Sequence, residues 1–342
     1  MSGTSYAAYT RVKAKYGKRL TEKDYKALLD CEKVSDVMAY LKSNTHYINA
    51  FGEANERGIR RGLFESLLRQ YQINEYDTIC RFELSLGEDI SHYVAHKTEI
   101  DEIIRILTKL NSRDEQVYHL TVPAHIAKKT SIKLNTLANA ENYEQFLEAV
   151  RGTSYEPILK QFNVKNGERI PITEIENKLY SKLCRELFSA ISKLEETEKE
   201  ELKELLQISV DCRNFLNIVR LKSYYVADDK IIAKYILPYG SIKDKVIFDM
   251  CAADDVESVY NIMAKTRTGK ILKKIDSEQI DELELLVRFK KARHNIYFSD
   301  SPATVMMSYI LLCEIELHNL ICIIEGARYN VNKEVIKPLL IY

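Results

Sequence analysis

The sequence contains little glycine and proline, and no tryptophan. Its 342 residues include 11 glycines and 6 prolines, about 3% and 2% of the chain against roughly 7% and 5% in typical proteins. A β-sandwich or β-barrel needs more turn residues than these few would supply. The scarcity therefore favours long helices, and 46% hydrophobic residues is enough for more than one core at this length.

The chain also lacks an excess of charge of either sign. It has 50 basic and 50 acidic side chains, so its formal charge is zero. A general nucleic-acid-binding protein needs a basic excess to displace counterions from phosphates, and a polybasic membrane-surface protein needs one to attract anionic lipids. We therefore expect no nucleic-acid partner and no direct electrostatic attachment to lipid.

Disulfide and zinc frameworks are not indicated. The seven cysteines are an odd number, and no C-x-x-C spacing occurs. We expect reduced, mostly buried thiols in a cytosolic protein. Residues 1–6 contain no apolar core, so we also expect no signal peptide.

The longest apolar stretch, residues 305–324, carries Glu314, Glu316 and His318 near its middle. A carboxylate at the centre of a bilayer costs on the order of 2.5–3.5 kcal/mol on insertion scales. We therefore expect this stretch to be a buried helix of a soluble protein.

Helical periodicity runs through almost the whole chain, as in Ile175, Leu179, Leu183 and Leu187. No window of clean apolar and polar alternation competes with it, so the sequence predicts an all-α fold. After a turn at residues 166–171, Thr173 with Glu176 three residues later predicts a capping box at the start of a helix.

A pattern recurs three times along the chain. In each copy, three apolar residues at helical spacing lead to a threonine that ends the helix: Val34, Val37, Leu41 and Thr45; Tyr143, Phe146, Val150 and Thr153; Val256, Val259, Met263 and Thr266. The first two copies close with Tyr47 and Tyr155, and the third lacks this tyrosine.

A second pattern follows each copy and places an acid in an apolar helix with a partner at i+3. The pairs are Asp101 with Ile104, Asp211 with Asn214, and Glu316 with Asn319. A period near 110 residues predicts three related helical lobes at residues 1–117, 118–228 and 229–342. The alternative is that helical patterning alone generates part of the similarity by chance.

Motifs for catalysis, cofactors or metals are weak. Residues 267–270 (Arg-Thr-Gly-Lys) resemble the end of a phosphate-binding loop, but Ala264 and Ile271 stand where glycine and Ser/Thr are required. His92 and His96 have a spacing that can hold zinc, with Glu88 as a third ligand, or they lie on a plain surface helix. We predict no catalytic, cofactor-binding or metal-binding residues.

The acids inside apolar helices leave two interpretations open. A buried carboxylate needs hydrogen-bond partners, and the neighbouring candidates are Arg213, Asn214 and Arg220 for Asp211, and His318 and Asn319 for Glu316. Such an acid is either a general acid/base or a polar pin that fixes helix register. No nucleophile or oxyanion device accompanies it, which favours the pin.

Several segments in this order resemble the C subunit of the V/A-type rotary ATPases, which is similar to the d subunit of the eukaryotic vacuolar enzyme. The segments are Tyr9-Thr10-Arg11-Val12-Lys13, the Thr-x-Tyr helix ends, Asp211-x-x-Asn214 with Arg220, Leu237-Pro238-x-Gly240, and Glu314-x-Glu316-x-x-Asn319-Leu320 through Gly326. The resemblance spans almost the whole chain.

The resemblance implies a non-catalytic, funnel-shaped protein of three helical lobes on the cytoplasmic face of a membrane proteolipid ring. It implies that the chain receives the rotor shaft, made of the D and F subunits, and transmits torque that couples ATP hydrolysis or synthesis to H⁺ or Na⁺ movement. It implies no cofactor and no nucleotide site, and membrane contact only through the ring. Two other classes stay open: a helical interaction scaffold outside the ATPase, and an enzyme that uses Asp211 or Glu316.

Overall fold

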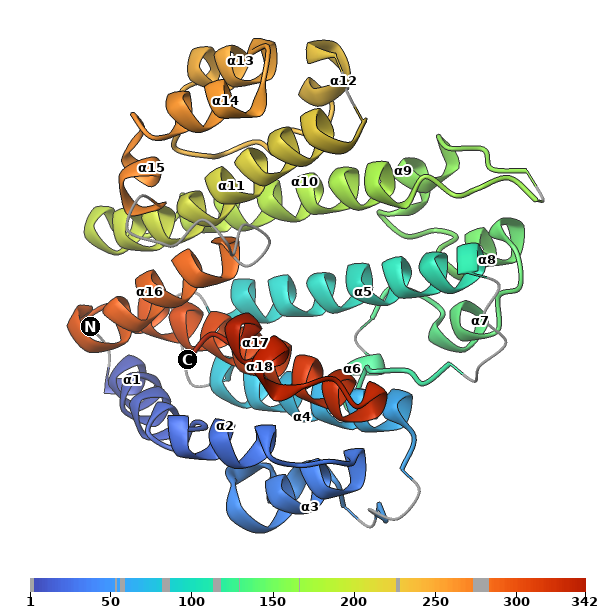
Figure 1. Ribbon diagram of the computed structural model, residues 1–342, viewed down its shortest axis with the longest axis vertical. Coiled ribbons are helices and arrows are strands. Elements are labelled where there is room, and N and C mark those ends of the chain that lie inside the picture. The colour runs from blue at the N-terminus through green and yellow to red at the C-terminus, as the bar shows by residue number, and fades with distance from the viewer. Residues whose placement is uncertain are drawn as a thin grey trace.

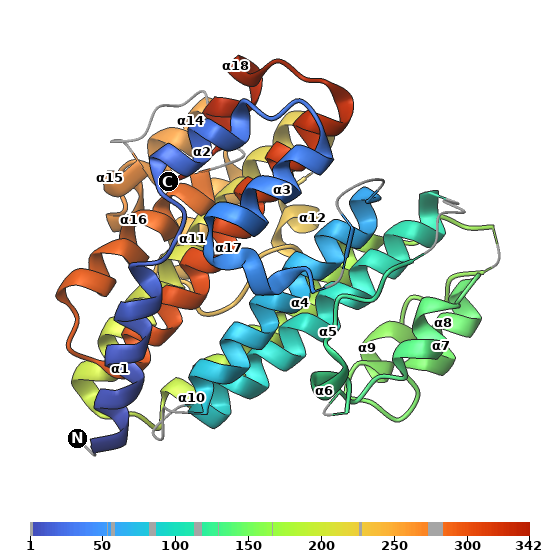
Figure 2. The same cartoon turned by 90° about the horizontal axis from the view of Figure 1, so that it is seen from below.

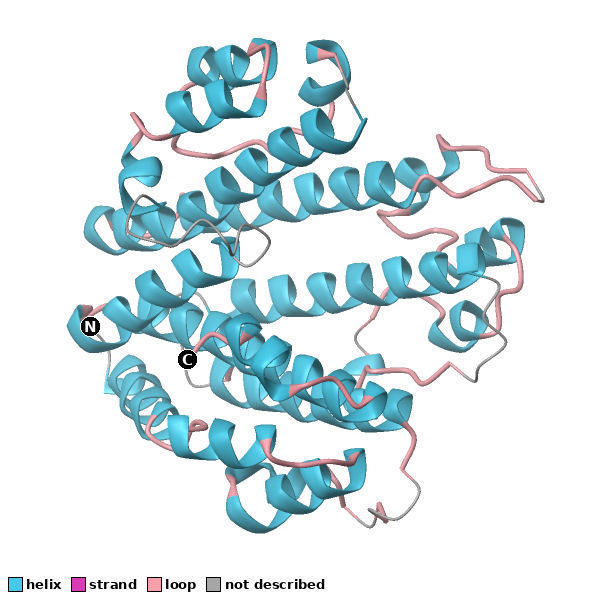
Figure 3. Cartoon of the chain, in the orientation of Figure 1, coloured by secondary structure: helices cyan, strands magenta, loops and turns pink. Residues whose placement is uncertain are grey.

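The computed structural model describes residues 3–52, 54–55, 59–81, 87–112, 118–128, 130–165, 167–225, 228–272 and 283–342. In these ranges all regular structure is helical and no strand occurs (Figure 3). The predicted all-α fold is confirmed.

Six long helices form the body of the molecule and run roughly side by side across Figure 1. Residues 192–195 and 299–301 form two turns between consecutive long helices, and both turns lie at the left of that view. The helices are α4 (Arg61–Cys80), α5 (Gly87–Ser112), α10 (Ile172–Ile191), α11 (Glu196–Tyr225), α16 (Leu283–Phe298) and α17 (Pro302–Tyr329).

Short helices gather in three groups around the long ones (Figures 1 and 2). The groups are α2 (Glu22–Leu29), α3 (Val34–Asn44) and η1 (His46–Ala50); α6 (Ala124–Ala127), α7 (Leu134–Ala138), α8 (Tyr143–Ala149) and α9 (Glu156–Lys160); and α12 (Asp229–Ala233), α13 (Asp244–Ala252), α14 (Val256–Met263) and α15 (Arg267–Leu272). In addition, α1 (Gly3–Tyr16) packs on α17, and α18 (Lys333–Ile336) and η3 (Lys337–Leu339) follow α17.

One hydrophobic cluster fills the space between the long helices, and three further clusters lie under the groups of short helices. Two of these three are built from segments near one another in sequence, residues 73–183 and residues 208–287. The other joins residues 20–68 to residues 317–340. The group of α2 and α3 therefore shares its core with the C-terminal half of α17.

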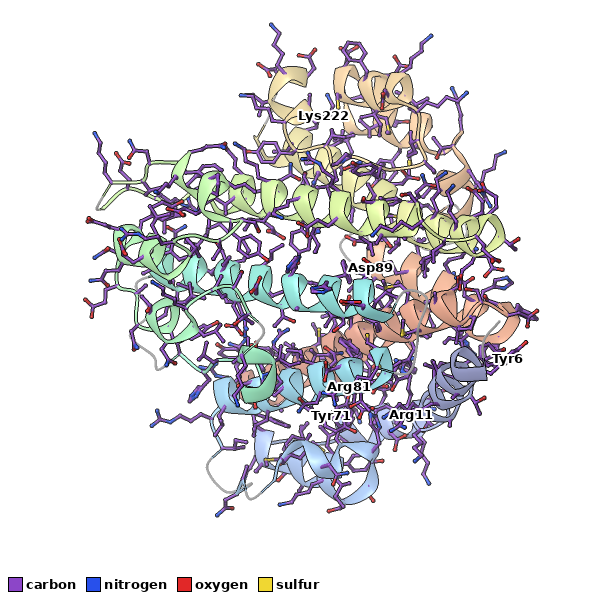
Figure 4. All side chains as sticks on the ribbon, turned by 180° about the vertical axis from the view of Figure 1, so that it is seen from behind. Tyr6, Arg11, Tyr71, Arg81, Asp89 and Lys222 are labelled. Carbon is purple, nitrogen blue, oxygen red and sulfur yellow. The ribbon has the colours of Figure 1, made fainter. Side chains whose placement is uncertain are left out.

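Polar contacts join the groups to the long helices at their edges. In Figure 4, Lys222 lies near the end of α11 and Tyr71 lies on α4. The Lys222 ammonium donates to the carbonyl of Ala253 at 2.5 Å, and the Tyr71 hydroxyl donates to the carbonyl of His46 at 3.0 Å.

Helix α17 contains the apolar stretch that the sequence predicts to be buried. Val305, Met306, Ile310 and Ile315 are fully buried. Within the described residues, α17 is one helix with the length and apolarity of a membrane span, but 78% of its most apolar window is buried inside the protein. The expected buried helix is confirmed.

The predicted capping box at Thr173 is wrong. Helix α10 begins at Ile172, its N-cap is Pro171, and no side chain caps it. The ring of a proline fixes φ near the helical value, so the helix starts earlier than the threonine. A capping box occurs instead at Thr21 and Asp24, where the Asp24 carboxylate accepts the Thr21 N–H at 2.7 Å.

Gly269 permits the close approach of α15 to the end of α14. A Cβ at this position would overlap the Met263 carbonyl oxygen and lie 2.9 Å from Cα of Ala264. Both contacts are backbone, so the helices would have to separate. We expect Gly269→Ala to lower the free energy of unfolding by about 1–3 kcal/mol in urea titrations. Gly17→Ala is the control, because its nearest atoms lie 3.7 Å away, and equal midpoints for the two variants would contradict the packing argument.

Candidate functional site

Three buried carboxylates connect the long helices to the groups of short helices. They are Glu99 on α5, Asp211 on α11 and Glu316 on α17, and each is at most 1% exposed. Each carboxylate accepts one hydrogen bond from a backbone N–H of a loop. It accepts another from the hydroxyl of the residue two positions after one of the repeated threonines. We call these sets of contacts the three carboxylate bridges.

The Glu316 bridge connects the two ends of the chain. Its Oε2 accepts the N–H of Leu20 at 3.1 Å, and its Oε1 accepts the hydroxyl of Tyr47 at 2.9 Å. The Nε of Arg19 forms an ion pair with Oε2 at 3.1 Å. Helix α17 is thereby fixed to α2 and α3.

The Glu99 bridge has the same two kinds of donor. Its Oε1 accepts the N–H of Ser131 at 2.5 Å, and its Oε2 accepts the hydroxyl of Tyr155 at 2.5 Å. Burial raises the pKa of Tyr155, and the charge of Glu99 raises it further, so the phenol stays protonated and donates. This bridge fixes α5 to the group of α7, α8 and α9.

The Asp211 bridge has four donors. Oδ1 accepts the N–H of Ser241 at 2.8 Å and of Ile242 at 3.2 Å, and Oδ2 accepts the hydroxyls of Ser241 at 2.5 Å and Thr268 at 2.9 Å. Thr268 takes the place of the tyrosine that the third copy lacks. Gly240 makes room for the carboxylate, because a Cβ there would overlap Oδ1.

The three threonines end their helices by a shared mechanism, as the repeat predicts. The hydroxyls of Thr45, Thr153 and Thr266 donate to the carbonyls of Leu41, Val150 and Met263 at 2.6, 2.7 and 2.7 Å. Each threonine hydroxyl oxygen also accepts a hydrogen bond from a backbone N–H. The donors are Tyr47 at 3.2 Å, Tyr155 at 3.2 Å and Gly269 at 2.9 Å. In the first two copies the threonine thus also holds the residue that reaches the carboxylate, whereas in the third it holds Gly269, next to Thr268.

The residue at i+3 from each acid holds a second backbone segment. Asn214 exchanges two hydrogen bonds with the backbone of Leu237, at 2.7 and 3.0 Å, and Asn319 does the same with Ile341, at 3.0 and 2.7 Å. On α5 the position is Glu102, which accepts the N–H of Thr121 at 2.9 Å. In each of the predicted pairs Asp211–Asn214 and Glu316–Asn319, the acid therefore binds one loop and the asparagine holds a second backbone segment.

The predicted pair of Asp101 with Ile104 is wrong, because Glu99 and Glu102 occupy the corresponding positions. Asp101 is half-buried and pairs with Lys97 at 3.1 Å. Burial raises the pKa of Asp101, but Lys97, the Tyr180 hydroxyl and the charge of Arg69 together outweigh this effect, so the pKa is lowered. The true spacings are 112 residues from Glu99 to Asp211 and 105 from Asp211 to Glu316, less regular than the period of 110 that suggested Asp101.

Most of the partners predicted for the acids are wrong as well. The candidates were neighbours on the same helix, whereas the donors come from residues at least 30 positions away, such as Ser241 for Asp211. Glu99, Glu102 and the loop amides were missed by sequence reasoning. The tyrosine two residues after the threonine was the available signal, since a buried phenol needs an acceptor.

The segment 267–270, which resembles the end of a phosphate-binding loop, makes structural contacts. Thr268 bonds Asp211, Gly269 packs on α14, and Arg267 pairs with Glu204. The segment forms helix α15 rather than a phosphate-binding loop.

The two histidines on α5 do not converge. The ring centroids of His92 and His96 are 6.3 Å apart, and Nδ1 of His96 lies 2.8 Å from Glu186. Across the described ranges, no group of three or more potential metal ligands occurs.

Comparison with known proteins decides the family. Residues 8–339 match the profile of the family described as ATP synthase (C/AC39) subunit. The chain belongs to this family. The C subunit of the A-type ATP synthase of Methanosarcina mazei is 26% identical over 352 residues, covering 99% of this chain and 94% of the relative. The protein of the same name from Pyrococcus abyssi is 21% identical and covers 96% and 88%.

Membership of the C/AC39 family makes the chain a non-catalytic component of an ATPase complex that is associated with a membrane. The predicted family and the predicted lack of enzymatic activity are both confirmed. The bridges accordingly act as polar pins in this C/AC39 protein: hydrogen-bond donors engage both oxygens of each carboxylate.

The hydroxyl donors of the bridges should contribute measurably to the stability of the C/AC39 protein. We expect Tyr155→Phe to lower the free energy of unfolding by about 1.5–3 kcal/mol, because the lost bond is to a charged acceptor. Tyr143→Phe is a matched control, since its hydroxyl donates to the neutral carbonyl of Leu159 at 2.8 Å and should cost about 0.5–1.5 kcal/mol. Urea unfolding measures both values, and equal losses would contradict the charged bridge.

The Glu316 bridge also predicts a dependence on pH through His46, whose Nε2 lies 3.6 Å from Oε1 of Glu316. Burial lowers the pKa of His46 below its ordinary value of 6.5, against the opposing effect of Glu316. A lowered pKa means that the unfolded chain takes up the proton first, so stability is full above pH 6.5 and falls as the pH decreases.

We expect the urea midpoint of the wild-type chain to decrease between pH 7.5 and 5.5, and the decrease to be smaller in His46→Gln. The control is His92→Gln, whose side chain is 67% exposed and should follow the wild type. If His46→Gln followed the wild type too, His46 would not be the titrating group.

Proposed function

We propose that the chain is the central-stalk component that connects the rotor shaft, made of the D and F subunits, to the proteolipid ring of a V/A-type ATPase. In this role it transmits torque and couples ATP hydrolysis or synthesis to H⁺ or Na⁺ transport. The observation that carries the proposal is the family match over residues 8–339, which includes nearly the whole chain.

We propose further that the chain consists of three related helical lobes arranged as a funnel. The three bridges support this proposal, because each carboxylate on a long helix accepts a loop N–H and a hydroxyl two positions after a repeated threonine. The boundaries 1–117, 118–228 and 229–342 stay a prediction. The shared core of residues 20–68 and 317–340 implies that one lobe would be closed by both ends of the chain.

A torque-transmitting protein must resist deformation, and the bridges supply that resistance. Helices packed at crystal-like density already deform little. Bonds to buried charges add directional contacts between long and short helices, and these contacts are expensive to break because the carboxylate would be left unsatisfied. The bridges therefore suit a part that carries load.

We place the protein peripherally on the cytoplasmic face of the membrane, with membrane contact only through the ring. The burial of α17 supports this placement, because the most apolar helix among the described residues is already covered by protein. An all-helical interaction scaffold that acts outside the ATPase would share the same fold, and it is the alternative that the experiment must separate.

The test is purification of the tagged full chain from its native membranes after gentle solubilisation. We expect the shaft proteins, the proteolipid and ATPase activity to be retained together. A mock purification from untagged membranes is the control. Recovery of the folded, helical chain without any of these components would overturn the central-stalk proposal and favour the scaffold.

Membranes from cells that lack the chain provide a second readout. ATP-dependent ion uptake into their vesicles should be lost and should return when the purified chain is added back. Full uptake without the chain would contradict a coupling role.

A further inference from the structure

A polar cavity of about 220 Å³ lies between α4, α5 and α17, outside the three bridges. Three cationic side chains line it: Arg69 from α4, and Lys97 and Arg105 from α5. The Gln72 amide from α4 and the His318 ring from α17 line it as well, together with the carboxylates of Asp101 and Glu314. The cavity can hold several water molecules or one small ion.

Two of the three cations already have carboxylate partners. Lys97 forms ion pairs with Asp101 at 3.1 Å and with Glu314 at 3.4 Å. Arg105 pairs with Glu102 and also bonds Thr121. The two carboxylates of the cavity wall are therefore engaged by Lys97, and Glu314 is engaged also by Arg288 at 2.8 Å.

Arg69 differs from the other two. Its Nε is buried without a hydrogen-bond partner, and among the described residues no ion pair to its guanidinium is present. Burial lowers the pKa of Arg69 and the charge of Arg105 lowers it further, and together they outweigh the opposing charges of Asp101, Glu65 and Glu102. A half-buried charge whose Nε makes no hydrogen bond within the described structure carries a cost, so an anion in direct contact with Arg69 would reduce it.

The cavity size and the type of donor limit the class of anion. Pockets for nucleotide-sized or drug-sized ligands usually measure about 300–1,000 Å³, so this cavity fits a smaller molecule. A guanidinium presents parallel N–H donors that match the oxygens of a phosphate or carboxylate, whereas chloride offers no such geometry. Gln72, one turn after Arg69 on α4, adds an amide donor on the same helix.

We propose that this cavity is a binding site for inorganic phosphate, a small tetrahedral oxyanion, with Arg69 as its main ligand and Gln72 as a second donor. The bound phosphate supplies the direct partner that the Nε of Arg69 lacks among the described residues and ties α4 to the cavity wall formed by α5 and α17. This site is independent of the central-stalk proposal, because it depends only on the side chains of this chain.

The test is thermal unfolding of the purified full chain in phosphate, with sodium chloride in the comparison sample at equal ionic strength. We expect saturating phosphate to raise the melting temperature by about 2 °C and sulfate to act similarly. Calorimetric titration then measures the affinity. A wild-type chain that shows no shift and no binding heat would overturn the proposal.

Arg69→Met should abolish the phosphate-dependent shift. It should not lower the melting temperature in chloride, because it removes a half-buried charge that makes no ion pair with the described residues and keeps an apolar stem. Arg185→Met changes an exposed arginine on α10 and should keep the full shift. A shift in Arg69→Met equal to that of the wild type would overturn the assignment of the ligand.

Two further measurements cover the remaining outcomes. If Arg69→Met does not fold, Arg69→Lys keeps the charge without the planar fork and should weaken phosphate binding at least tenfold; unchanged affinity would count against Arg69. Glycerol phosphate distinguishes a free ion from the head group of a lipid. Binding of glycerol phosphate as tight as that of inorganic phosphate would overturn the free-ion assignment.

Discussion

A carboxylate buried inside a protein must be surrounded by hydrogen-bond donors, and this requirement organises the whole molecule. Glu99, Asp211 and Glu316 lie on long helices and take their donors from distant loops. Each acid therefore constrains the path of a segment far from it in sequence. The threonines, Gly240 and the asparagines at i+3 are consequences of the same requirement, since they direct donors to the acid or hold the adjoining loop.

The fold class and some of the bridge residues could be predicted because they leave local signals. Helical periodicity, the threonine that ends a helix, and an acid in an apolar helix are each visible within a few residues, as at Asp211 and Glu316. The partners could not be predicted in this way. A backbone N–H such as that of Leu20 has no sequence signature, and Glu99 was missed because Asp101 fitted an even spacing better. The cavity at Arg69 is likewise formed by three helices that only tertiary packing brings together.

The bridges and the cavity put opposite demands on the same helices. In the bridges both oxygens of each carboxylate accept hydrogen bonds, which makes the connection between a long helix and its group of short helices stiff. At Arg69 the Nε makes no hydrogen bond in the part of the chain that the structure describes, and the phosphate that we propose would bind there, between α4, α5 and α17. Both properties would be of use in the proposed central-stalk role, because stiffness transmits force and a bound anion would adjust that stiffness.

The long span of the Glu316 bridge has a consequence for synthesis on the ribosome. The contacts of Tyr155 with Glu99 and of Thr268 with Asp211 span 56 and 57 residues, so both can form while the chain is still emerging. The contact of Tyr47 with Glu316 spans 269 residues. Helices α2 and α3 are made early, yet they lack the part of their core that residues 317–340 supply until α17 has been translated. The N-terminal segment is thus the last to be secured, and its docking marks a finished chain that is ready for assembly.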